Sequence, residues 1–178
     1  MLKHLVITAL GDDRPGIVNE LSKEILDKKC NIVDSRMAVL GEQFAIIMLV
    51  SGKWDKLAKL ESSSDDLGNK LGLTISTKYT QGRKHNKDKI PYIVEAVTID
   101  QPGVVNSLAS FFSDSGINIE SINTSTYNAA ITGAQMFSAQ ITVNIATDIQ
   151  IAQLREDFFE LCDDINLDAT FEPLKGSF

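Results

Sequence analysis

The residues with the clearest capacity for chemistry lie in one short motif that occurs twice. The first copy reads Asp13-Arg14-Pro15-Gly16-Ile17-Val18-Asn19, and the second reads Asp100-Gln101-Pro102-Gly103-Val104-Val105-Asn106. Glycine removes a side chain where a ligand could approach the backbone. Free amides at a helix N-terminus, with the positive end of the helix dipole, can hold a carboxylate. The motif therefore predicts an anion-binding turn, and a capped helix start without a ligand is the alternative.

The spacing of this motif also predicts how the following helix begins. Asp13 and Asp100 are placed to cap the helix, because a carboxylate can accept hydrogen bonds from the first free amides. Pro15 and Pro102 are expected in the first turn, where the amide that proline lacks would have no partner inside the helix.

A second pair of polar residues, Asn31 and Asn118, stands at the expected start of the second strand in each copy. We expect this strand to lie beside the first strand, so that the two amides can reach the turn. An amide offers both a donor and an acceptor, which suits the ammonium and carboxylate groups of an amino acid. The alternative is that each asparagine stabilises a tight turn from helix to strand.

Other reactive residue types are scarce. Neither His4 nor His85 lies near a plausible base partner, and Cys30 and Cys162 fall on apolar stretches that are expected to be buried. The sequence has no phosphate-binding loop, no dinucleotide-binding fingerprint and no nucleophile elbow. We therefore expect no catalytic residues, no metal site, no cofactor and no enzyme activity.

Composition excludes further classes of protein. The 178 residues are 43% hydrophobic and 23% charged, which is typical of a globular protein. With 17 basic and 24 acidic residues the net charge is −7, which disfavours direct binding to nucleic acid. The longest apolar runs are much shorter than the roughly 20 residues of a membrane-spanning helix. Two cysteines are too few for a disulfide framework. Since no segment is expected to direct the chain to a membrane, we expect a cytoplasmic protein with reduced thiols.

An internal repeat sets the expected domain organisation. Residues 6–32 align with residues 93–119 without a gap and share ten identities in 27 positions, where chance would give about one or two. The chain is therefore predicted to hold two tandem domains, at residues 1–80 and 92–178, joined by a polar linker at residues 81–91. Basic residues in this linker could suggest contact with nucleic acid, but a solvated linker is the favoured interpretation.

Each copy shows the same order of elements. Strands are expected at Leu5–Leu10, Ile32–Leu40, Gln43–Ser51 and Leu73–Tyr79 in the first copy, and at Ile93–Val97, Ile119–Tyr127, Gln135–Ile145 and Leu167–Phe171 in the second. One helix follows the first strand of each copy and another precedes the last strand; a serine-rich run at residues 62–66 could interrupt the latter in the first copy. This β-α-β-β-α-β order predicts an α+β fold of two ferredoxin-like units, each an antiparallel sheet with helices on one face.

Two such modules, each with a D-x-P-G-[IV]-V-N turn and an N-I strand start, resemble tandem ACT domains. Residues 5–19, together with residues 30–41 and 51–54, are similar to the glycine cleavage system transcriptional repressor family. The resemblance covers essentially the whole chain and is closer in the first copy. In the second copy Gln101 replaces the arginine and the hairpin diverges.

This resemblance implies a cytoplasmic regulator without a DNA-binding element of its own. Such a protein is expected to repress glycine cleavage genes by contacting a LysR-type activator protein, with glycine relieving the repression. ACT domains bind small amino acids at the loop between the first strand and the first helix, usually across an interface between two domains, and often pair sheets edge to edge, which implies a homodimer. The implied ligand-binding residues are Asp13, Arg14, Pro15, Gly16, Ile17, Val18, Asn31, Asp100, Pro102, Gly103, Val104 and Asn118.

Two other functions stay open at this point. One is an ACT-type allosteric subunit that binds a small amino acid and controls a metabolic enzyme. The other is a structural or ligand-storage protein whose loops regulate nothing.

Overall fold

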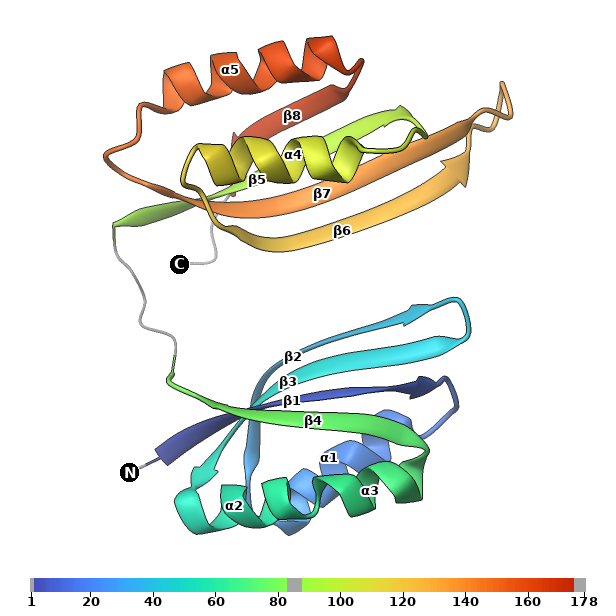
Figure 1. The fold of residues 1–178 in the computed structure, drawn as a ribbon, viewed down its shortest axis with the longest axis vertical. Helices are drawn as coiled ribbons and strands as arrows, with labels where there is room; N and C mark the ends of the chain where they lie inside the picture. The colour runs from blue at the N-terminus through green and yellow to red at the C-terminus, as the bar shows by residue number, and fades with distance from the viewer. Residues whose placement is uncertain (1, 83–87, 175–178) are drawn as a thin grey trace. The chain divides into compact units, whose positions relative to one another are not determined.

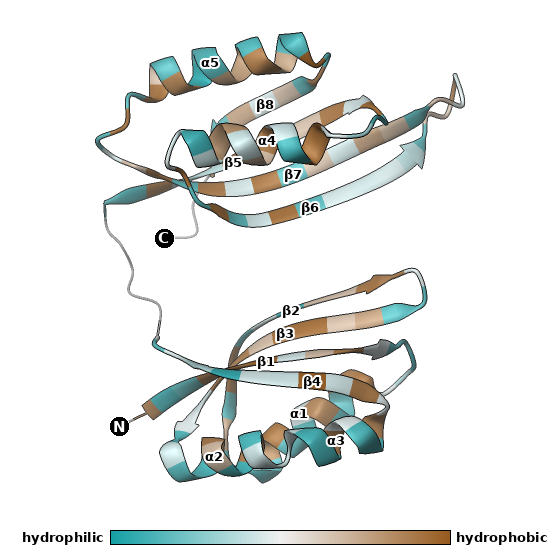
Figure 2. Cartoon of the chain, in the orientation of Figure 1, coloured by the Kyte–Doolittle hydropathy of each residue, from teal (hydrophilic) through white to brown (hydrophobic). Residues whose placement is uncertain are grey.

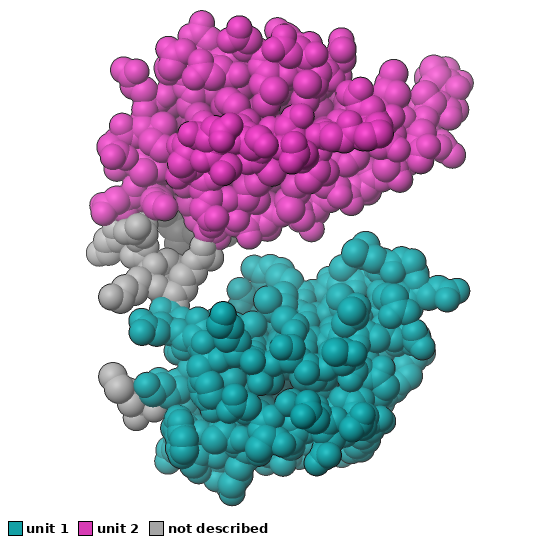
Figure 3. Space-filling view, viewed as in Figure 1, with its two compact units in different colours: residues 1–84 teal, residues 85–178 magenta. Residues whose placement is uncertain are grey.

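The computed structural model describes residues 2–82 and 88–174 and divides the chain into two compact units, residues 1–84 and 85–178 (Figure 3). The strand β5 (Lys89–Ile99) begins inside the predicted linker of residues 81–91. Residues 83–87 of that segment, including His85, lie outside the described residues.

The first unit has the predicted order of elements (Figure 1). They are β1 (Leu2–Asp12), α1 (Ile17–Asp27), β2 (Asn31–Leu40), β3 (Gln43–Lys53), α2 (Trp54–Ser62), α3 (Ser64–Leu71) and β4 (Leu73–Thr80). The strands form one antiparallel sheet in the order β2-β3-β1-β4, with the helices on one face.

The second unit repeats this arrangement (Figure 1). Its elements are β5, α4 (Val104–Asp114), β6 (Ile119–Asn128), β7 (Gln135–Ala146), α5 (Ile151–Asp164) and β8 (Asp168–Pro173), and the sheet order is β6-β7-β5-β8. The prediction of an α+β fold with two ferredoxin-like units is confirmed.

The expectation that the second strand lies beside the first is wrong in both units. β3 lies between β2 and β1, and β7 lies between β6 and β5. The connection through α1 causes this order. It returns the chain to the end of the sheet where β1 begins, and the hairpin of β2 and β3 follows. In this hairpin β3, the second strand, pairs with β1, while β2 pairs only with β3.

Alternating side chains build the two cores. Burial alternates along both β3 and β7, as expected for strands with one buried face. Along β7 the hydropathy alternates as well, and Figure 2 shows this as brown bands separated by paler ones. The helix α1 buries Ile17, Leu21 and Ile25, which recur at intervals of four residues and so lie on one helix face. Cys30 and Cys162 are buried in the two cores, which confirms the prediction of core thiols.

The helical segment before β4 is interrupted, as the serine-rich run suggested. α2 ends at Ser62 and α3 begins at Ser64. The Ser63 hydroxyl donates to the carbonyl of Lys59 at 2.9 Å, and the Ser64 hydroxyl donates to that of Glu61 at 2.7 Å. These local bonds satisfy carbonyls at the end of α2 and compete with continuation of the helix.

Candidate ligand-binding site

Each Pro-Gly turn lies at the end of a central strand and leads into a helix. The turns start alike: the amide of Asp13 donates to the carbonyl of Glu42 at 3.0 Å, and that of Asp100 donates to the carbonyl of Gln135 at 2.9 Å. Gly16 and Gly103 then adopt φ angles of 94° and 96°. This left-handed region favours glycine, so the backbone path itself requires glycine at both positions.

The predicted capping by Asp13 and Asp100 is wrong. Gly16 and Gly103 are the N-cap residues, and their carbonyls accept the first helical bonds, from the amides of Glu20 and Ser107 at 2.9 Å. Within the described residues, neither α1 nor α4 has a side-chain cap. The aspartates precede the N-cap by three residues, which is too early for a cap.

Pro15 and Pro102 stand immediately before the N-cap glycines rather than in the first helical turn, so that expectation is also corrected. The first-turn amides of α1 and α4 consequently keep their capacity to bind an anion, which is the feature that the anion-binding interpretation needs.

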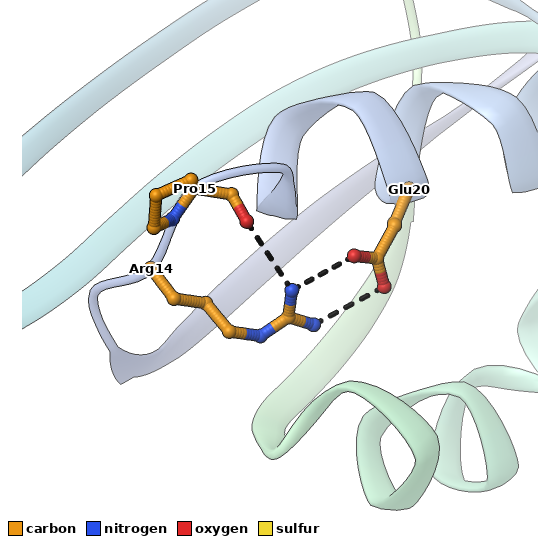
Figure 4. Close-up of polar contacts among 3 residues, drawn as sticks. All are labelled: Arg14, Pro15 and Glu20. Carbon is orange, nitrogen blue, oxygen red and sulfur yellow. Dashed lines mark hydrogen bonds and ion pairs between the residues drawn. The ribbon is translucent and has the colours of Figure 1, made fainter.

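In the first copy a charged pair lies beside the turn (Figure 4). Arg14 donates through Nη1 to Oε1 of Glu20 at 2.8 Å and through Nη2 to Oε2 at 3.1 Å, and Nη1 also lies 3.5 Å from the carbonyl oxygen of Pro15. Hydrogen bonding from Arg14 holds the pKa of the Glu20 carboxyl below its ordinary value, and Glu20 raises the pKa of Arg14. The guanidinium of Arg14 is thus already paired with a carboxylate of the protein itself.

In the second copy the corresponding positions hold Gln101 and Ser107. Gln101 donates through Nε2 to the carbonyl of Ile165 at 3.1 Å. A hollow of about 240 Å³ opens beside the turn. It is lined by Gln101, Pro102, Gly103, Val104, Ser107, Asp164, Ile165 and Asn166, so the start of α4 and the end of α5 both contribute to it.

The two asparagines do not join the turns of their own units. Asn31 pairs with Ser51, which pairs with His4, whereas the turn follows Asp12 at the other end of β1. The eight residues from His4 to Asp12 correspond to roughly 26 Å along the strand. Asn118 likewise precedes Ile119, at the end of the second sheet far from the turn after Ile99.

The structure therefore brings the predicted ligand residues together only in part. Residues 13–18 form one continuous turn and residues 100–104 another, but each asparagine lies at the opposite sheet end. Sequence reasoning missed Glu20, Ser107 and the end of α5. The opposite charges of Arg14 and Glu20, six residues apart around a turn, were a sequence signal that could have identified Glu20. No local sequence pattern indicated that the end of α5 lies beside the second turn.

Other chemistry finds little support in the described parts of the chain. Burial raises the pKa of the Cys30 thiol, and it raises that of Cys162 to about 11. Residues 2–82 and 88–174 contain no group of three or more His, Cys, Asp or Glu side chains that could hold a metal ion. Among the same residues, no helix is long and apolar enough to cross a membrane.

Comparison with known proteins identifies relatives over both units. The ACT domain family model matches residues 3–78. The chain is 35% identical over 163 residues to the glycine cleavage system transcriptional repressor of Escherichia coli (strain K12), an alignment that covers 92% of this chain and 86% of that protein. It is also 34% identical over 80 residues to a UPF0237 protein of Methanococcus maripaludis, covering 44% of this chain and 89% of that protein.

Two solved structures are similar over nearly the whole chain. A crystal structure of a candidate glycine cleavage system transcriptional repressor is 30% identical, with a TM-score of 0.75 and coverage of 99% of both chains. The structure of an unknown protein from Galdieria sulphuraria is 25% identical, with a TM-score of 0.81 and coverage of 98% and 99%. The tandem arrangement of two such units is thus shared with known proteins.

Proposed function

We propose a function for this chain on the premise that it belongs to the family of the glycine cleavage system transcriptional repressor. The proposed function is that of a cytoplasmic, glycine-responsive regulator that represses glycine cleavage genes. It acts by contacting a DNA-binding activator protein of the LysR type, not by binding DNA itself. The family relationship over 92% of the chain supports the regulatory role, and the geometry of the turns supports an amino-acid ligand.

The observation that carries the ligand proposal is the hollow in the second unit. It lies between the start of α4 and the end of α5. The positive end of one helix dipole and the negative end of another therefore border the same space. A zwitterion such as glycine fits this arrangement, with its carboxylate at the first-turn amides of α4 and its ammonium near Asp164.

The two copies are proposed to differ in readiness for a ligand. In the first unit a ligand carboxylate must displace Glu20 from Arg14 or bind beside the pair. In the second unit no such exchange is needed, because the positions of that pair hold Gln101 and Ser107. The second turn is therefore proposed as the site that glycine fills first, although the first copy is closer to the family in sequence.

The distribution of charge supports a protein partner over DNA. Residues 85–178 carry four basic and 13 acidic side chains, a net charge of −9, while residues 1–84 carry 13 basic and 11 acidic side chains, a net charge of +2. A DNA-binding surface draws on concentrated positive charge to neutralise phosphates. The second unit repels a polyanion.

Calorimetric titration with glycine, serine, alanine and a panel of other amino acids tests the ligand proposal. Saturable glycine binding is expected in the natural chain and in Ser110→Glu, a control that adds a carboxylate at an exposed position of α4. Gln101→Arg with Ser107→Glu, which transfers the Arg14–Glu20 pair to the second unit, is expected to weaken binding at least tenfold. Unchanged binding in this variant would exclude the second turn.

The two regulatory roles need a separate test. Binding of the chain to a purified LysR-type activator of glycine cleavage genes, weakened by glycine, supports the repressor. Binding of a different amino acid alone, without contact with the activator, would favour the allosteric subunit of a metabolic enzyme. Binding to DNA with a steep salt dependence would contradict action through a protein partner.

A further inference from the structure

The sheet of the first unit has an unusual surface on the side opposite its helices. Side chains of a strand alternate between two faces, so the residues between the buried Leu5, Ile7 and Ala9 of β1 point away from the helices. On this outer face the two central strands carry Val6, Thr8 and Leu10 from β1, and Ala45, Ile47 and Leu49 from β3, so Thr8 is the one polar member of the six. Leu10 is 52% exposed and Ile47 is 48% exposed.

The second unit provides an internal control for this surface. Positions on β7 that correspond to Ala45, Ile47 and Leu49 hold Ser138, Gln140 and Thr142. Both units have the same fold and the same strand pairing. An apolar central strand on the outer face is therefore not needed for the fold, and its presence in the first unit indicates a surface that another molecule covers.

Charges flank the apolar centre of this face in a particular order. Asp34 of β2 pairs with Leu49 of β3, Leu49 pairs with Val6 of β1, and Val6 pairs with Lys78 of β4. Directly paired residues of antiparallel strands share one face of the sheet. This row across the sheet thus reads acidic, apolar, apolar, basic. The next two rows, Arg36-Ile47-Thr8-Ser76 and Ala38-Ala45-Leu10-Thr74, contain one cation and no carboxylate. The Asp34 carboxylate also accepts a hydrogen bond from Arg36 on the same strand.

Two copies of such a row can pair with each other, with the acidic end of one row opposite the basic end of the other. When two sheets stack face to face about a two-fold axis parallel to their strands, the strand order of one copy runs opposite to that of the other. β2 then lies over β4 of the other copy, and β3 lies over β1. Each residue keeps its level along the strands, so Asp34 of one copy faces Lys78 of the other, and Leu49 faces Val6.

We propose that this outer face of the first sheet is the interface of a homodimer, in which two copies of the chain pack sheet to sheet with Asp34 of each opposite Lys78 of the other. Sheets pack about 10 Å apart in this manner in β-sandwiches. The proposal places the dimer contact on the face of the sheet, not at its β2 edge. It does not depend on the proposed regulatory function.

The outer face of the second sheet does not have this property. Its three corresponding rows are Ser121-Thr142-Ile93-Glu172, Asn123-Gln140-Glu95-Thr170 and Ser125-Ser138-Val97-Asp168. Each of these described rows contains one carboxylate and no cation, so two copies of this face would repel each other. Self-association is therefore specific to the first unit.

The size of the face sets the expected strength of the dimer. Four strands about 4.8 Å apart and about eight residues long at 3.3 Å each give a face of roughly 500 Å². Stable interfaces commonly bury about 800 Å² on each partner. A dimer that dissociates on dilution is expected.

Sedimentation velocity of the full chain over a wide range of protein concentration tests the proposal. Ile47→Gln, which introduces the residue of the second unit, is expected to raise the dimer dissociation constant at least about tenfold. Leu26→Gln is the matched control, because Leu26 is 69% exposed on α1 and lies outside the proposed interface. Circular dichroism is used to check that each variant is folded.

Charge reversal makes the test specific for contact between two copies. Asp34→Lys alone and Lys78→Asp alone each place like charges opposite each other and are expected to abolish dimers. An equimolar mixture of these two variants pairs opposite charges at both contacts and is expected to restore dimers. No contact within one chain can produce this rescue.

Three results would overturn the proposal. They are a natural chain that stays monomeric at all concentrations, a dimer that survives Ile47→Gln but not Leu26→Gln, and single-variant monomers that do not associate when mixed. The second of these would place the interface at the β2 edge and α1.

Discussion

Arg14 and Glu20 form a two-point ion pair across the start of α1, with Nη1–Oε1 and Nη2–Oε2 distances of 2.8 and 3.1 Å. Both side chains are 41% exposed, so the pair is accessible to solvent and to ligands. Since the second unit lacks this pair, the two turns have the same backbone conformation but present different charges to a ligand.

We expect the Glu20 carboxyl to titrate below the ordinary range of glutamate. Its pKa is lowered in the folded chain, chiefly by the hydrogen bond from Arg14. The pair therefore contributes stability that is complete above the ordinary glutamate pKa and is lost as the pH falls through the lowered value. Carbon-13 NMR of the side-chain carboxyl measures this titration, and Arg14→Gln should return the pKa of Glu20 toward its ordinary range. An unchanged titration in Arg14→Gln would show that the pair does not form in solution.

Gly103→Ala is expected to lower the free energy of unfolding of the ligand-free chain by about 1–2 kcal/mol. The φ of 96° disfavours any residue with a Cβ, while no described atom outside Gly103, its chain neighbours and the adjoining helix backbone lies within 4 Å of the added methyl group. The loss therefore reports backbone strain, not a clash. Urea denaturation measures it, and Ser110→Ala on the exposed side of α4 should change the value by less than about 0.5 kcal/mol. Equal values for the two variants would refute the requirement for glycine.

Lys29→Gly is expected to stabilise the first unit by about 0.5–1 kcal/mol, because Lys29 has a φ of 58° at the end of α1. The aligned position of the second unit is Gly116, with a φ of 68°. Thermal or urea unfolding checks the gain. Lys28→Gly, at a φ of −79°, is the control and should give no gain, since glycine there only increases the freedom of the unfolded chain.

Cys162 is expected to react slowly with thiol reagents at neutral pH. It is 2% exposed and its pKa is raised to about 11, so both access and thiolate are scarce. Because folding raises the pKa of Cys162, the unfolded thiol loses its proton at lower pH than the buried one. The free energy of unfolding is therefore unaffected by this group below the ordinary thiol pKa and falls as the pH rises from there toward about 11. Labelling with a chromogenic disulfide should accelerate sharply when urea unfolds the second unit, and rapid labelling in native buffer would contradict the burial.

The candidate site was only partly predictable from sequence. The Pro-Gly turns stand out because the motif is local and occurs twice, and both form as continuous turns. The prediction that Asn31 and Asn118 reach these turns rests on an incorrect strand order. Asn31 begins β2 as expected, and Asn118 directly precedes β6. Strand pairing, however, involves residues far apart in the chain, which local patterns do not specify.

By itself, the sequence determined the duplication, the order of strands and helices, the buried thiols and the position of the two turns, because each follows from short-range periodicity or from the repeat. Only the tertiary structure decided that β3 separates β2 from β1, that glycine and not aspartate begins each helix, and that α5 borders the second turn. It also decided that Asp34 and Lys78 end the same row of the sheet. These relationships depend on long-range strand pairing and on the packing of helices on the sheet, which bring together side chains dozens of residues apart.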